Sequence, residues 1–155
     1  MATNQKKPIS AKLAVRKTKP KIRMGLEKKK TQVLFNKLIT SKGFCEMCGS
    51  RVNQLQCSHI YSIGAHQGLR YDILNVVCHC SYCHRFKWHD DPPGGWEWFK
   101  SKYPERLEYL LFATQQFKKF TMDDLLKVRE LVKNKDLKGL ITFNEQYQNR
   151  GLTSD

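Results

Sequence analysis

Two Cys-x-x-Cys pairs constrain this sequence of 155 residues more than any other feature. The first pair is Cys45 and Cys48, and the second is Cys80 and Cys83. Each pair places two thiolates on one tight turn, so two pairs can supply the four sulfur ligands of a closed tetrahedral zinc site. We therefore expect a structural zinc ion to join the two segments.

The distance along the chain between the two pairs indicates an inserted element. Thirty-one residues separate Cys48 from Cys80, whereas compact sites of this kind have roughly 15 to 20. Short strand-like runs extend from Arg51 to Gln56 and from His59 to Ile63, and a loop is expected from Gly64 to Gly68. The sequence therefore predicts a two-stranded ribbon between the cysteine pairs.

The positive charge of the chain is concentrated at its N-terminal end. Residues 1–30 carry eleven lysines and arginines against one acid, Glu27, which leaves +10 of the total net charge of +14. Such a concentration is typical of a segment that binds a polyanion, although a solvated tail or a membrane-surface segment would also be basic. We expect nucleic-acid contacts from this segment, made by Lys17, Lys19, Lys21 and Arg23.

Composition indicates one modest soluble domain without membrane association. Hydrophobic residues make up 40% of the chain, and no apolar run approaches the roughly 18 residues of a membrane span. The lysine-rich start lacks the apolar region of a secretory signal, so we expect a cytoplasmic protein with reduced cysteines. Cys57 and Cys78 are then expected to be buried thiols, although Cys78-His79-Cys80 leaves an exchange of zinc ligands open.

Periodicity and breakers divide the chain into four expected segments. They are a basic flexible arm (1–26), a zinc-stabilised core (27–100), C-terminal helices packed on that core (101–135) and a polar tail (136–155). Within these segments, helices are predicted from Glu27 to Thr40, from Ser81 to His89, after Pro104 and after the N-cap Thr121, and a turn cluster is predicted from Asp90 to Gly95.

Aromatic and histidine side chains outside the predicted ribbon are assigned mainly to packing. Trp88, Trp96, Trp98 and Phe99 would suit base stacking, but an aromatic cluster after a turn more often forms part of a core. His66 and His79 are expected to be surface or packing residues.

Three polar residues in and after the insertion are of types that hydrolyse phosphodiesters. His59 has an imidazole that can accept a proton from water at neutral pH, Asn75 has an amide that can orient it, and His84 has a second imidazole suited to a catalytic divalent ion. Alone, His59 would more often be a core histidine on a strand. The order of all three residues favours a catalytic site.

The order of these residues resembles the HNH, or ββα-metal, endonucleases with a four-cysteine zinc. The resemblance spans about residues 30–100 and places His59, Asn75 and His84 at the H, N and H positions. The stretch from His59 to Ala65, followed by Leu69-Arg70-Tyr71-Asp72, is most similar to the NinG/Rap branch of phage recombination endonucleases. The resemblance implies an α+β fold: a small zinc-stabilised ββα-metal core with flanking helices and a basic N-terminal arm.

The resemblance also implies roles for individual residues. His59 would activate water, Asn75 would orient His59, His84 would bind catalytic Mg²⁺ or Mn²⁺, and Arg70 would contact the phosphate. Two positions depart from the pattern: Ser58 stands where many HNH enzymes have Asp or His, and His84 stands where the NinG/Rap branch has Asn. His89 is a further candidate ligand, but on a regular α-helix it would point away from His84.

The expected function is metal-dependent cleavage of DNA, with branched DNA such as Holliday junctions as the substrate that the NinG/Rap similarity implies. Because a symmetric junction requires two cuts, a homodimer would follow. The alternative is a non-catalytic zinc-containing nucleic-acid-binding or adaptor protein, in which the histidines pack or complete the metal site.

Overall fold

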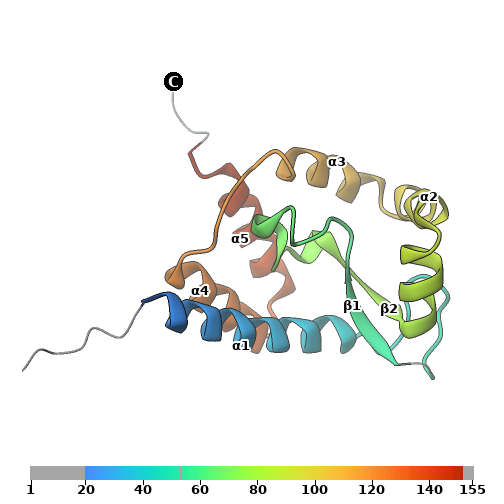
Figure 1. Ribbon diagram of the computed structural model, residues 1–155, viewed down its shortest axis with the longest axis horizontal. Coiled ribbons are helices and arrows are strands. Elements are labelled where there is room, and N and C mark those ends of the chain that lie inside the picture. Colours follow the sequence, from blue (N-terminus) through green and yellow to red (C-terminus); the bar gives the residue numbers. More distant parts are fainter. Residues whose placement is uncertain (1–19, 53, 152–155) are drawn as a thin grey trace, which may run out of the picture.

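The computed structural model describes residues 20–52 and 54–151, and its sheet is a two-stranded antiparallel ribbon. Strand β1 (Leu55–His59) pairs with β2 (Val76–Cys80), and His59 lies opposite Val76 (Figure 1). The prediction of a mixed α+β fold is therefore confirmed.

The predicted strands were wrong in position. A single strand, β1, spans the gap between the two expected strands, and its partner begins only at Val76. The ribbon ends after His59 because the Asn75 side chain, rather than a strand backbone, accepts the N–H of Tyr61 at 2.8 Å. Residues 60–63 therefore turn away from β2 into a loop.

The long first helix, α1 (Pro20–Thr40), begins at Pro20 rather than at the expected Glu27. Proline suits the first turn of a helix, where its missing N–H costs no hydrogen bond. The last residues of the expected arm are thus helical, and Arg23 lies exposed on α1. Lys17 and Lys19 lie outside the described residues, and Lys21 is placed only as a backbone position of α1.

After β2 the chain forms a π-helix, η3 (Cys83–His89), and then α2 (Pro92–Lys102). A helix was predicted at the first of these positions, but with regular α geometry. The predicted turn cluster was partly wrong, because Asp91 caps α2 by accepting the N–H of Gly94 at 3.2 Å, and two prolines occupy its first turn.

Two of the C-terminal helices were predicted correctly and one was missed. Helix α3 (Pro104–Ala113) follows its proline, and α4 (Met122–Lys133) begins with a capping box between Thr121 and Asp124. The expected polar tail instead contains α5 (Leu137–Asn149). Its inward face includes Asn144 and Gln148, which are fully buried although they are polar.

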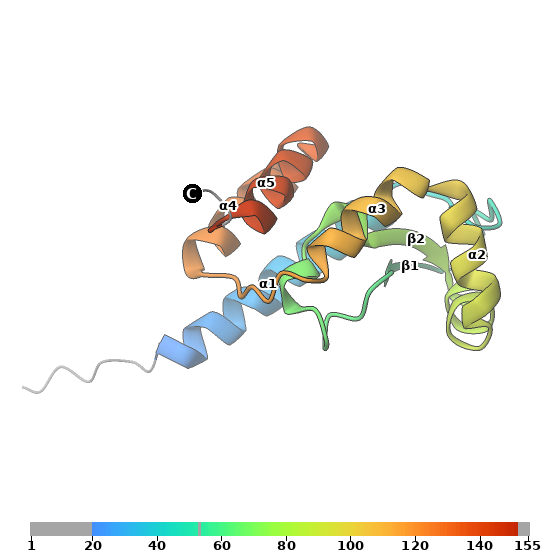
Figure 2. The ribbon, with the colours of Figure 1, turned by 90° about the horizontal axis from the view of Figure 1, so that it is seen from above.

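Two apolar clusters hold the ribbon from opposite faces. Val76 and Cys78 pack in the cluster formed with α1, α4 and α5, whereas Val77 packs in the cluster formed with the π-helix, α2 and α3. Figure 2 shows α4 and α5 on one side of the molecule and α2 at the other end. Strand β2 is buried throughout because its two faces belong to different clusters.

The aromatic residues after the ribbon pack as predicted. Trp88 and Phe99 are buried, Trp96 and Trp98 are half-buried in the same cluster, and His79 is fully buried between the rings of Trp88 and Trp98. Within residues 20–52 and 54–151, no helix is both long and apolar enough to cross a membrane.

Candidate metal centre and histidine pocket

The four cysteines of the two pairs come together at one end of the ribbon. Their sulfur atoms all lie within 4.8 Å of one another, and the Sγ atoms of Cys48 and Cys80 are 3.8 Å apart. Tetrahedral zinc with Zn–S bonds of about 2.3 Å requires sulfur atoms about 3.8 Å apart. The prediction that Cys45, Cys48, Cys80 and Cys83 come close enough together to bind a metal ion is confirmed, and their geometry is compatible with structural zinc.

The remaining two cysteines stand apart from this cluster. Cys57 and Cys78 lie opposite each other in the ribbon, and Cys78 is buried while Cys57 is half-buried. Cys78 and Cys80 are two residues apart and share a face of β2, but Cys78 packs in the cluster with α1, α4 and α5, whereas Cys80 joins the other three cysteines. The exchange of ligands that the sequence left open does not occur.

The first cysteine pair forms a tight turn with hydrogen bonds suited to thiolates. Gly49 has a φ of +75°, a conformation that favours glycine, and its N–H donates to the carbonyl of Cys45 at 2.8 Å. Although burial opposes the change, backbone N–H groups of Cys48, Cys80 and Met47 lower the pKa of Cys45 to about 7. A thiolate is the form of cysteine that binds metal.

Glu46, inside the first pair, anchors the cluster to its surroundings. Its buried carboxylate accepts the Cys78 N–H at 2.5 Å and the Tyr103 hydroxyl at 2.8 Å, and it pairs with Lys42 at 2.9 Å. Burial favours the protonated form, but hydrogen bonds from Cys78 and Lys42 outweigh it and lower the pKa of Glu46. No sequence pattern indicates this anchor, because Cys78 and Tyr103 lie 32 and 57 residues away along the chain.

An open pocket of about 460 Å³ lies beside the ribbon, and three histidines line it. His59 comes from the end of β1, whereas His84 and His89 come from the π-helix. The structure therefore brings His59 and His84 to one pocket, as the sequence predicted for a shared site. The rest of the lining is mainly apolar and includes Ile60, Ile63, Trp88, Pro92 and Trp96.

One hydrogen bond determines which nitrogen of His59 is free. Its Nε2 lies 3.1 Å from the carbonyl oxygen of Arg70. Because a carbonyl can only accept, Nε2 carries the proton and Nδ1 keeps a lone pair in the neutral ring. Burial lowers the pKa of His59, with a smaller opposing effect from this hydrogen bond. The neutral ring, which can accept a proton at Nδ1, is therefore favoured at neutral pH.

Asn75 holds together the loop that carries the Arg70 carbonyl. The side chain is fully buried, accepts the Tyr61 N–H at 2.8 Å, and donates to the carbonyls of Tyr61 at 3.1 Å and Leu69 at 3.2 Å. It thus ties the segment after His59 to the segment before Arg70. The hydrogen bonds of the Asn75 side chain go to Tyr61 and Leu69 rather than to His59, and an orienting role for Asn75 stays a prediction.

Arg70, expected to contact a phosphate, directs its side chain toward α1. Its Nη1 donates to Gln32 Oε1 at 3.4 Å, and its backbone carbonyl is the group that holds His59. The side chain is half-buried. A phosphate contact by Arg70 stays a prediction.

His84 and His89 form a close pair, and the expectation that His89 points away was wrong. Their Nε2 atoms are 3.1 Å apart and their ring centroids 4.7 Å apart. The reason is the π-helix, whose i to i+5 hydrogen bonding widens the turn and brings residues five apart onto one face. Periodicity arguments based on 3.6 residues per turn do not anticipate this arrangement.

The contact between the two imidazoles is a hydrogen bond, and its length is also compatible with two ligands of one metal ion. His84 Nδ1 lies 2.6 Å from Gln56 Oε1, so with the amide oxygen as acceptor His84 Nε2 has a lone pair that faces His89. Metal–nitrogen bonds of about 2.0 to 2.1 Å at angles of roughly 90° to 110° separate two nitrogens by about 2.8 to 3.4 Å. The 3.1 Å separation lies within that range. Gln56 would fix the ring, and sequence reasoning missed it.

Comparison with protein-family models, with curated proteins and with solved structures finds no match for this chain.

Proposed function

We propose that this protein is a metal-dependent DNA endonuclease of the HNH, or ββα-metal, kind, with His59 as its general base. The observation that carries the proposal is a single open pocket lined by a strand histidine with a free Nδ1 and by a pair of helix histidines spaced for one metal ion. The chain order of β1, β2 and the π-helix is the order of a ββα unit, and the four-cysteine cluster lies at its base.

In the proposed reaction, His59 Nδ1 accepts a proton from a water molecule while Arg70 holds the opposite nitrogen through its carbonyl. The water oxygen attacks phosphorus, the bond to the 3′ oxygen breaks and that oxygen takes a proton from solvent, which leaves 5′-phosphate and 3′-hydroxyl ends; His59 then loses its proton to solvent. Bound Mg²⁺ or Mn²⁺ would neutralise charge on the phosphate and on the leaving oxygen. His84 and His89 would hold that ion, and Gln56 would orient His84.

The charge of the chain supports a polyanionic substrate. The net charge is +14, and Arg23, Lys29 and Lys30 are exposed along α1. Phosphate contacts by such residues supply sequence-independent affinity that falls as salt rises. The similarity to the NinG/Rap branch extends the proposal to branched DNA of phage recombination, which a homodimer would cut symmetrically.

The experiment that tests the proposal is cleavage of a DNA panel by zinc-loaded protein with added Mg²⁺ or Mn²⁺. Supercoiled, linear, flapped, forked and four-way DNA would be compared for wild type and His84→Ala. We expect metal-dependent cutting by wild type and loss of cutting in the variant. If wild type binds DNA but leaves every substrate intact, the enzyme is excluded and a zinc-containing nucleic-acid-binding protein is supported.

The rate of cleavage should fall on the acid side at a pH below the ordinary histidine pKa of about 6.5. Burial lowers the pKa of His59, so the reactive neutral ring persists to lower pH and is lost as pH falls through that lowered value. The measurement is kcat/KM against pH at saturating metal. An acid limb that lies above 6.5, or that survives unchanged in a His59→Ala protein with residual activity, would contradict the assignment.

Replacing His89 with alanine should weaken binding of the catalytic ion without removing the structural metal. Loss of a residue that only hydrogen-bonds to a metal ligand typically costs about 10-fold to 100-fold in metal affinity. His89 is proposed as a ligand itself, so the half-saturating Mn²⁺ concentration should rise by at least about 10-fold. Titration of zinc-loaded protein with Mn²⁺, followed by electron paramagnetic resonance, measures binding without relying on activity. Lys87→Ala, at an exposed position of the same helix, is the control. Equal Mn²⁺ affinity in both variants would remove His89 from the site.

A further inference from the structure

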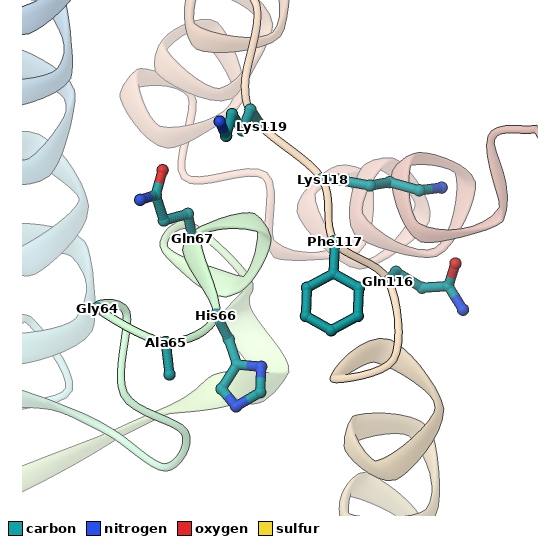
Figure 3. A pocket seen from close by; sticks show the side chains of 8 residues that line it. All are labelled: Gly64, Ala65, His66, Gln67, Gln116, Phe117, Lys118 and Lys119. Carbon is teal, nitrogen blue, oxygen red and sulfur yellow. The ribbon is translucent and has the colours of Figure 1, made fainter.

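A second, smaller pocket of about 140 Å³ lies between two loops on the other side of the segment that follows His59. One wall is the stretch from Gly64 to Gln67, and the other is the connection between α3 and α4, residues 116–119. Figure 3 shows the rings of His66 and Phe117 projecting in the same direction from the two walls, with Gln67 and Lys119 near the opposite end.

The two walls are held together by close packing and by hydrogen bonds. Gly68 lies so near the second wall that a Cβ there would come within 3.2 Å of the Lys118 carbonyl oxygen. Gln148 donates to the Gly68 carbonyl at 3.1 Å, and Lys118 Nζ donates to the carbonyls of Tyr147 at 2.9 Å and Arg150 at 2.7 Å. Both loops are therefore anchored to α5, and the pocket is preorganised.

Phe117 is an apolar ring left in water. It is 89% exposed, more than any other aromatic side chain described, and a tight turn closed by the Lys118 N–H to the Gln116 carbonyl at 2.9 Å projects it. Across the pocket, His66 is half-buried and packs edge-on against Tyr61, with ring centroids 5.5 Å apart. A ring held out by an anchored loop gains free energy when a flat apolar group covers it.

The remaining groups around the pocket match the chemistry of a nucleotide. Gln67 and Gln116 have amides that can donate to and accept from base edges, and Lys119 supplies a positive charge. None of the residues that line the pocket is acidic. Inside a duplex the faces of the bases are covered by their neighbours, so an unpaired base can offer its face to Phe117 without the cost of unstacking a base pair.

One loop contributes residues to both this pocket and the histidine pocket. Ser62 and Ile63 line the pocket that contains His59, and the next residues, from Gly64 onward, line the pocket that contains Phe117. The two pockets are therefore neighbours along this loop, so one DNA strand that follows the loop could contact both.

We propose that Phe117 and His66 form a stacking site for an unpaired base of the DNA substrate, next to the nuclease pocket. The proposal rests on the proposed function, because it assigns the adjoining nucleotides of the same substrate. In this proposal the protein selects DNA that is single-stranded near the cut, as at a flap or branch point.

The test is equilibrium binding without added divalent ion, so that no strand is cut. Flapped DNA with 2-aminopurine in the flap is compared with a fully paired duplex of the same length. Stacking is worth about 1 to 3 kcal/mol per base, so Phe117→Ala should raise Kd for flapped DNA roughly 5-fold to 150-fold and remove the 2-aminopurine quenching. It should leave Kd for the duplex unchanged, and Phe117→Trp should retain tight binding. Phe112→Ala, an exposed phenylalanine of α3 outside the pocket, is the matched control and should behave as wild type.

Three results would overturn the proposal. One is unchanged binding and quenching in Phe117→Ala, and another is an equal loss of affinity for flapped and paired DNA. The third is a Phe117→Ala protein that binds DNA like wild type but no longer binds vesicles of phosphatidylcholine and phosphatidylserine to which wild type binds. That result would make Phe117 a membrane contact. Cleavage by wild type is scored separately: a protein that binds flaps through Phe117 but never cuts contradicts the nuclease and retains the stacking site.

Discussion

Replacing Cys45 and Cys80 together with serine is expected to abolish tight metal binding and to unfold the core. The two residues come from different pairs, so the double variant leaves only one sulfur on each side of the cluster. The cluster joins the end of α1, β2 and the π-helix, and only Met47 and Leu55 pack beside it as partly buried apolar side chains. Structural zinc contributes about 10 to 16 kcal/mol in small zinc-binding peptides at pH 7, whereas whole domains are stable by about 5 to 15 kcal/mol.

Zinc content per chain and thermal unfolding followed by circular dichroism measure this effect. Wild type should hold one zinc per chain and unfold cooperatively, and the double variant should hold none and lack a cooperative transition. Cys57→Ser is the matched control, because Cys57 is a half-buried thiol outside the cluster; it should keep its zinc. A double variant that retains one zinc per chain, or that melts at the wild-type temperature, would rule out the metal as the clamp of this fold.

The cysteine cluster was predictable because its signal is local. A Cys-x-x-Cys turn brings two sulfurs together whatever the rest of the chain does, so only the meeting of the two turns depended on the fold. The capping box at Thr121 and the proline that begins α3 are equally local, and both helices were located correctly. Turns, caps and helix starts whose interacting residues lie within a few positions of one another can be predicted from the sequence.

The position of the ribbon was not predictable from alternation alone. Strand β2 is buried on both faces because α1, α4 and α5 cover one face while α2 and α3 cover the other. The ribbon ends where the Asn75 side chain takes the place of a backbone partner. Both causes involve tertiary contacts, which override local preferences for strand formation.

Helix α5 was missed for a related reason. Asn144 and Gln148 face inward, and this disguises the helical stripe formed by Leu140, Phe143 and Tyr147. The two amides donate to the carbonyls of Tyr71 at 3.3 Å and Gly68 at 3.1 Å, which are 73 and 80 residues away in sequence. Polar residues satisfied by such distant backbone groups look like surface residues until the fold is known.

His89 shows how a local departure from regular geometry changes a site. Its spacing from His84 suggests opposite directions on an α-helix, but the π-helix places their Nε2 atoms 3.1 Å apart. Single π-turns in proteins are often found at functional sites. With His84 Nε2 unprotonated, the contact requires either a proton on His89 Nε2, as in a hydrogen bond, or a cation bound by both nitrogens, which is the proposed ion.

Replacing His59 with alanine is expected to reduce the rate of DNA cleavage by about 10² to 10⁴, the usual contribution of a positioned general base. The variant loses Nδ1, which the hydrogen bond from Nε2 to the Arg70 carbonyl leaves free to accept a proton. Because His59 lines an open pocket and lies outside the cysteine cluster, zinc content and DNA affinity should stay at wild-type values. Single-turnover rates at saturating Mg²⁺ or Mn²⁺, with Kd measured separately, distinguish a lost base from lost binding.

Two further measurements make the His59 result specific. Added imidazole should restore part of the rate in His59→Ala, since it replaces the missing proton acceptor in a pocket of about 460 Å³, and it should leave His84→Ala unrescued. Thr142→Ala, at an exposed position of α5, should cut like wild type. Cleavage by His59→Ala at the wild-type rate would remove this histidine from the chemistry.

Because the proposed ion is bound elsewhere, by His84 and His89, Mn²⁺ affinity should be unchanged in His59→Ala, which separates activation of water from binding of the ion.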